Sequence, residues 1–169
     1  MTQHGRLGDF RYVIGGVAVR YERRVDAPAD RVWAALTEPG ELARWLGHVT
    51  IEDKAVTVRL GPDAPGGTGA VTYCHPAQML EVDLEWPGLP PARLVAEMAE
   101  LGAGRTVVVV EYRGLADEDA AEKSAQWHLR MDALAAAATG EGAPAGPPTP
   151  PADLVAAYEV HLAELRQVR

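Results

Sequence analysis

The stretch from Leu80 to Trp86 constrains the fold of this chain more than any other. Apolar residues at positions 80, 82, 84 and 86 alternate without exception with acidic residues at positions 81, 83 and 85. In a strand, successive side chains point to opposite faces of the sheet, so this pattern gives one buried face and one face in water. The stretch therefore predicts a strand of an antiparallel sheet that covers a core on one side only.

A second strong pattern lies in residues 117–139, which we expect to form one long helix. Acidic residues at positions 117–119 suit the positive end of the helix dipole, and Gly140 follows the last turn. Small and apolar residues recur at alternating spacings of four and three: Ala120, Ser124, Trp127, Met131, Leu134 and Ala138. Such a stripe is typical of a helix with one face against a core, and the helix would be roughly 34 Å long.

The other patterns predict further strands and three shorter helices. Strand-like segments cover residues 12–25, 48–52, 55–60, 70–75, 92–101 and 105–113. Two short helices are expected after the first strand, one opened by Pro28 and the other after Gly40, because both segments carry apolar residues at helical spacing. Another helix is expected over residues 152–166. Mainly antiparallel strands followed by a long helix indicate an α+β fold.

Prolines and glycines divide the end of the chain. They alternate densely between residues 140 and 151, which is typical of an extended linker. We therefore expect one domain over residues 1–139, a linker over residues 140–151 and an accessory helix over residues 152–169. That helix is too short to be a domain, so it should dock on the body or on a second subunit, and a homodimer through it is one expectation.

Composition argues against several classes of partner. The net charge of −8 argues against nucleic acid, whose binding modules usually carry basic stripes. No apolar run approaches the about 20 residues of a membrane span, and the first residues do not resemble a secretory signal. Cys74 is the single cysteine, which is compatible with a reducing compartment. We expect a cytoplasmic protein with no membrane span and no nucleic-acid partner.

An ordered series of short motifs resembles a known family. Residues 24–39 read R-x-D-A-P-x-x-x-V-W-x-A-L-T-E-P, and Trp45 follows. Residues 65–71 read P-G-G-x-G-x-V, residues 76–86 read P-x-x-x-L-x-x-x-L-x-W, and residues 104–106 read G-R-T. Residues 127–134 read W-H-x-x-M-D-x-L. In this order the motifs resemble the activator of heat-shock-protein-90 ATPase homologue (AHSA-type) family of the START-like, or SRPBCC, superfamily.

The resemblance implies a helix-grip fold. In that fold a curved antiparallel sheet of about six or seven strands wraps around a long C-terminal helix, with two short helices after the first strand; here an extra terminal helix is added. The resemblance also implies a pocket between the sheet and the long helix. Members of the superfamily bind lipids, polyketides or other hydrophobic molecules, some are cyclases or hydrolases, and the eponymous eukaryotic protein stimulates a chaperone.

Inward-facing positions of the strands and the long helix are the candidate pocket lining, because a sheet that curves away from its helix leaves space there. These positions are also the ordinary core positions, so both interpretations stay open. The candidates are Trp45, Tyr73, Leu84, Trp86, Met98, Val110, Tyr112, Trp127, Met131 and Leu134.

Two polar residues are further candidates for the pocket. Arg23 has the parity of the inward-facing Val19 and Tyr21, so it would need a carboxylate partner or a ligand acid; a salt bridge at the end of the sheet is the alternative. His128 lies beside the apolar stripe and is a candidate proton carrier at the pocket mouth. A surface pair with Asp132 at the i+4 position is the alternative for His128.

The sequence has no catalytic constellation. The histidines lack metal-binding spacing, the glycines of residues 66–69 do not fit a dinucleotide fingerprint, and Ser124 is the only serine and lies outside any nucleophile elbow. We expect no metal and no cofactor. The leading interpretation is a binding module for a small hydrophobic molecule. The alternatives are a cyclase or dehydratase that uses His128 or Tyr112 for proton transfer, and a chaperone-associated or other protein-interaction module.

Overall fold

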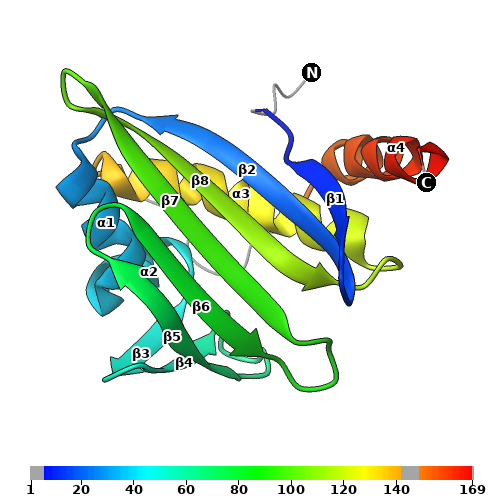
Figure 1. Cartoon of the computed structure of the whole chain (residues 1–169), viewed down its shortest axis with the longest axis horizontal. Coiled ribbons are helices and arrows are strands. Elements are labelled where there is room, and N and C mark those ends of the chain that lie inside the picture. The colour runs from blue at the N-terminus through cyan, green and yellow to red at the C-terminus, as the bar shows by residue number, and fades with distance from the viewer. Residues whose placement is uncertain (1–5, 142–148, 169) are drawn as a thin grey trace.

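One open sheet of eight antiparallel strands, in the order β1-β2-β8-β7-β6-β5-β4-β3, forms the framework of the protein (Figure 1). The computed structural model describes residues 6–141 and 149–168. The strands are β1 (Asp9–Val13), β2 (Gly16–Val25), β3 (His48–Glu52), β4 (Ala55–Arg59), β5 (Gly67–His75), β6 (Met79–Glu85), β7 (Ala92–Gly102) and β8 (Arg105–Leu115). The helices are α1 (Ala29–Thr37), α2 (Pro39–Trp45), α3 (Ala120–Ala138) and α4 (Ala152–Gln167).

The strand predicted from the alternating pattern is β6, which lies between β5 and β7. Leu80, Val82 and Leu84 are all buried on its inner face, whereas Glu81 and Asp83 lie half-buried on the outer face. This confirms that the sheet has one apolar face and one face in contact with water.

The first strand of the sheet differs from its prediction. A single strand over residues 12–25 was expected, but the chain turns at Ile14 and Gly15, and β1 pairs with β2 as an antiparallel hairpin. Gly15 has a φ of 90°, which a glycine adopts without steric cost. This hairpin is the reason that the sheet has eight strands instead of about six or seven.

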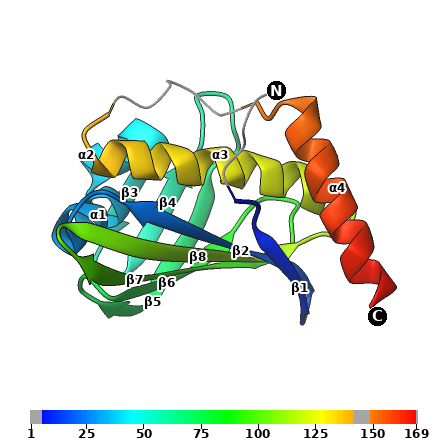
Figure 2. The ribbon, with the colours of Figure 1, turned by 90° about the horizontal axis from the view of Figure 1, so that it is seen from above.

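Helix α3 lies across the inner face of the curved sheet and packs most closely on β2 (Figure 2). Helices α1 and α2 cover one end of α3, and α4 packs against α3 near its other end, beside β1 (Figure 2). The arrangement confirms the helix-grip fold. Among the strands, α3 therefore rests mainly on β2 instead of on the strands β3 to β7.

The terminal helix docks on the body of the same chain. Leu154, Tyr158 and Leu162 of α4 are 0%, 0% and 3% exposed, and they pack into the same core as α3. The predicted linker of residues 140–151 falls mostly on residues 142–148, which lie outside the described residues. None of the helices in the described part of the chain is long and apolar enough to cross a membrane.

Candidate ligand-binding site

A cavity of about 530 Å³ lies between the inner face of the sheet and the helices. Its apolar lining comes from α1, α2 and the strands β3 to β7: Leu36, Leu42, Trp45, Leu46, Val49, Val56, Val58, Val71, Leu80, Val82, Leu84 and Leu94. Trp86 and Trp127 line it as well. We call this space the large cavity. A largely apolar cavity of this size is typical of a small-molecule site.

The polar group of Trp45 is satisfied away from the large cavity. Its indole N–H donates a 2.8 Å hydrogen bond to the backbone carbonyl of Ala35 in α1, and the residue is only 7% exposed. The indole ring therefore offers an apolar surface to the cavity without leaving a buried donor unpaired.

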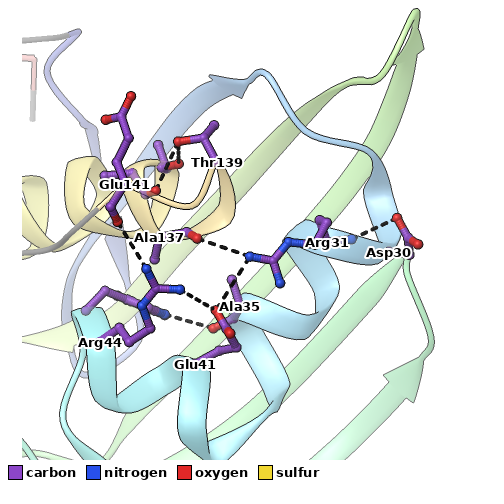
Figure 3. Close-up of polar contacts among 11 residues, drawn as sticks. Asp30, Arg31, Ala35, Glu41, Arg44, Ala137, Thr139 and Glu141 are labelled. Atoms are coloured by element: carbon purple, nitrogen blue, oxygen red, sulfur yellow. Dashed lines mark hydrogen bonds and ion pairs between the residues drawn. The ribbon is translucent and has the colours of Figure 1, made fainter.

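Helices α1 and α2, which form one wall of the large cavity, are tied to the end of α3. Arg31 donates to the carbonyl of Ala137 at 3.4 Å, and Arg44 donates to the carbonyl of Glu141 at 3.3 Å (Figure 3). Glu41 forms ion pairs with both guanidinium groups (Figure 3). The Ala137 carbonyl lies in the last turn of α3, where carbonyls lack partners within the helix and cations suit its negative end, and Glu141 follows the helix. These contacts fix the wall relative to α3.

A smaller cavity of about 270 Å³ adjoins the large one, because Leu60, Trp86 and Trp127 line both. We call it the small cavity. Tyr112 also lines it, accepts a 3.0 Å hydrogen bond from the Trp86 indole and lies with its ring centre 5.1 Å from that of Trp127. Burial raises the pKa of Tyr112, although the bond from Trp86 partly opposes this, so the phenol stays neutral at pH 7.

Comparison with known proteins identifies the family of this chain. The family model described as activator of Hsp90 ATPase homolog 1-like protein matches residues 26–139. This match covers α1 to α3 and all the strands that line the two cavities. The chain belongs to the activator of Hsp90 ATPase homolog 1-like family.

Solved structures show the same fold as this family member. CalU16 from Micromonospora echinospora, solved in solution, is 20% identical with a TM-score of 0.74, over 98% of this chain and 96% of that one. DynU16, described as a protein in the dynemicin biosynthetic locus, is 26% identical with a TM-score of 0.64, over 74% of this chain and 48% of that one. The Aha1 dimer from Colwellia psychrerythraea is 14% identical with a TM-score of 0.61, over 71% of this chain and 94% of that one. No curated protein matches the chain.

Five of the predicted lining residues of this family member face a cavity. Trp45, Leu84, Trp86 and Trp127 line the large cavity, and Tyr112 joins Trp86 and Trp127 at the small one. Their role in binding stays a prediction.

Four other predicted lining residues belong to the packed core and line neither cavity. Met98, Val110, Met131 and Leu134 are 8%, 2%, 1% and 0% exposed. The expected placement of these residues at the pocket is corrected, because α3 packs on β2 and α1 packs on β7 and β8, and the core is filled in that part of the sheet. The alternation of a strand predicts which residues face inward, but it does not predict whether an inward-facing residue contacts a helix or faces the cavity beside that helix.

Tyr73 points away from the large cavity and is 48% exposed, so its predicted inward placement is wrong. The reason is a bulge in β5: Val71 pairs with Val82 but Tyr73 pairs with Glu81, so Thr72 is an extra residue. The extra residue reverses the parity of the end of the strand. Cys74 consequently lines the large cavity instead.

Arg23 lies outside both cavities and has a carboxylate partner in the protein. Its Nε atom donates a 2.9 Å hydrogen bond to Asp132 on α3, and one of its two terminal nitrogens, Nη1, donates to the backbone carbonyls of Arg6 and Glu22. Arg23 is therefore held in a salt bridge, the alternative that the sequence left open.

His128 is also outside both cavities, because it faces α4. Its Nε2 atom lies 3.5 Å from Asp132, so the i+4 pair exists, but the side chain is 0% exposed and the pair is not at the surface. Its Nδ1 atom lies 2.8 Å from the hydroxyl of Tyr158, which also accepts a 2.8 Å hydrogen bond from the backbone N–H of Gly8. The predicted proton carrier thus packs under the terminal helix instead of at a pocket mouth.

Sequence patterns did not mark several residues of the cavities. Val56 and Val58 alternate with polar residues as in a strand with one buried face, but this alternation does not predict that β4 faces a cavity. Arg130 lines the small cavity. The sequence feature that could have indicated this is its position three residues after Trp127, which places a charged side chain beside the apolar stripe. No group of three or more His, Cys, Asp or Glu side chains that could hold a metal ion occurs within the described ranges.

Proposed function

We propose that this protein binds a small hydrophobic molecule in the large cavity. The observation that carries the proposal is the apolar lining of a space of about 530 Å³. Space of this kind inside a well-packed protein forfeits van der Waals contacts that a ligand would restore. Since the indole N–H of Trp45 is already bonded within the protein, the ligand needs to contribute mainly apolar surface there.

The turn between β3 and β4 is the entrance that we propose for the ligand. Ile51 lines the cavity and is 38% exposed, and Asp53 and Lys54 line it at the adjacent turn. An apolar ligand can therefore enter between this turn and the start of α2, where Pro39 also lines the cavity.

A melting-temperature screen with fatty acids, flavonoids and polyketides tests this proposal. A ligand present at 100 times its dissociation constant stabilises the folded state by about 2.7 kcal/mol, and each kcal/mol corresponds to about 2–4 °C for a chain of this size. We therefore expect at least one class to raise the melting temperature by about 5–10 °C. The biosynthetic locus named for DynU16 supports adding natural-product intermediates to the set.

Glucose and glycerol are the control compounds, since they have little apolar surface to bury. A screen in which hydrophobic compounds shift melting no more than these controls would contradict the proposal.

A homodimer and a cytoplasmic location stay predictions. The Aha1 neighbour is described as a dimer, which supports testing the assembly in solution. The apolar face of α4 packs on its own chain, so a dimer through this helix would have to use its outer face, where Val160 is 61% exposed. The division into a body of residues 1–139, a linker and an accessory helix also stays a proposal.

A further inference from the structure

Arg130 is a buried cation at the small cavity, and no carboxylate within the described residues forms an ion pair with it. The residue is 5% exposed and lines the cavity. One terminal nitrogen donates a 3.2 Å hydrogen bond to the carbonyl of Leu46, and the guanidinium lies 5.7 Å from the ring centre of Trp127. None of the ion pairs among the described residues includes Arg130.

Another poorly exposed arginine, Arg23, does have a carboxylate partner. Arg23, whose side chain is 11% exposed, is paired with the carboxylate of Asp132 at 2.9 Å. A buried charge without a carboxylate is costly, because one neutral carbonyl and a ring face replace only part of its hydration. Burial lowers the pKa of Arg130 to about 10, so its guanidinium is still charged at pH 7. Arg130 therefore keeps a positive charge that no ion pair among the described residues neutralises.

The other charged groups of the small cavity leave it with a net positive charge. Lys123 lies two turns before Arg130 on the same side of α3, and both line the cavity together with Asp119. Two cations and one carboxylate give a formal charge of +1 in a chain whose net charge is −8. That charge matches a group with a single negative charge. The phenol of Tyr112 adds a neutral donor at the same cavity.

The position of this charge relative to the large cavity defines an amphipathic ligand. The two cavities share Leu60, Trp86 and Trp127 in their walls, so a molecule that reached from the apolar space to the cationic one would pass beside these side chains. A guanidinium binds a carboxylate through two parallel hydrogen bonds, which suits a single anionic group.

We infer that the ligand is a hydrophobic carboxylic acid, with its apolar part in the large cavity and its carboxylate against Arg130 in the small one. This inference rests on the proposed function and adds the chemical class of the ligand. Lys123 and Tyr112 assist in holding the carboxylate, and Arg130 is the residue that selects for it.

Calorimetric titration of the full chain with decanoate and decanol tests the inference. The two probes share an alkyl chain and differ in the charged group. In Arg130→Met we expect decanoate to bind at least about 10-fold more weakly than to the wild type, because a charge-assisted hydrogen bond is lost. Decanol should bind the variant within about 2-fold of the wild type. Arg130→Lys keeps the positive charge but loses the planar guanidinium that makes two parallel hydrogen bonds. Its affinity for decanoate should lie between those of the wild type and Arg130→Met.

Matched variants separate a ligand contact from a structural role. Arg105→Met removes an exposed arginine at the first position of β8 and should leave both affinities unchanged. The melting temperature of unliganded Arg130→Met should equal or exceed that of the wild type, since replacing a buried unpaired charge by an apolar side chain removes its desolvation cost. If Arg130→Met does not fold, Lys123→Met must lower decanoate affinity selectively, and no change in it would overturn the inference.

The outcomes distinguish this inference from the proposed function. Equal losses of decanoate and decanol affinity in Arg130→Met, or no loss of either, would overturn the carboxylate inference while leaving hydrophobic binding intact. Wild-type protein that binds neither probe would overturn the proposed function, and the inference with it.

Discussion

Replacing Tyr158 with alanine is expected to lower the free energy of unfolding by about 3–5 kcal/mol, the usual cost of truncating a buried aromatic residue. Tyr158 is 0% exposed between α4 and α3, and its ring packs edge-on against Phe10 and His128, with centres 5.7 and 5.8 Å away. The variant therefore leaves a cavity where the terminal helix meets the body. Urea unfolding followed by circular dichroism measures the change.

Tyr158→Phe isolates the hydroxyl group from the ring. Its removal takes away the acceptor of the Gly8 N–H and the partner of His128 Nδ1, so we expect a loss of about 1–3 kcal/mol. Val160→Ala, at a position on the same helix that is 61% exposed, is the control and should change stability by less than about 0.5 kcal/mol. If Tyr158→Ala costs no more than Val160→Ala, α4 does not dock on the body as described.

Filling the large cavity with Val82→Trp is expected to weaken decanol binding by at least about 10-fold. Val82 lies on β6 in the middle of the sheet and lines the cavity, so an indole at this position would occupy the space of the ligand. The fold should survive, because the added side chain enters a space of about 530 Å³ instead of a packed core. Calorimetric titration gives the affinity, and circular dichroism checks the fold.

Glu81→Trp is the matched control for this variant. It introduces the same side chain one position earlier on β6, where successive residues point to opposite faces of the sheet. Decanol should bind this variant as it binds the wild type. Equal weakening by Val82→Trp and Glu81→Trp would show that the probe does not occupy the large cavity.

Periodicity predicted the parts of this fold in which each strand or helix has one simple apolar face. The alternation around β6 and the apolar stripe of α3 are both confirmed. A sheet with one face in water requires a period of two residues, and a helix packed on its other face requires a period of about 3.6. The β1–β2 hairpin was missed because the strand pattern of residues 17–22 was extended back to residue 12 through Gly15-Gly16, a dipeptide that is typical of turns.

The candidate site was predicted less completely, for physical reasons that individual residues illustrate. A single bulged residue, Thr72, reverses the orientation of Tyr73 and Cys74, and local sequence does not reveal such a register shift. Met131 and Trp127 belong to the same stripe of α3, yet only Trp127 lines a cavity. Which part of the stripe rests on the sheet depends on the path of α3 over β2, a long-range feature. The burial of Arg130 without a carboxylate partner among the described residues likewise depends on the whole fold.

Methyl NMR spectra recorded during a titration with decanol test the central claim most directly, since they locate the bound molecule. Binding in the large cavity predicts saturable shifts of the valine and leucine methyl groups of Val49, Val56 and Leu94, which line it. Leu154 and Leu162, which are buried on the inner face of α4 and line neither cavity, should keep their resonances unchanged. Shifts confined to Leu154 and Leu162, or no saturable shift at the cavity residues, would contradict the account.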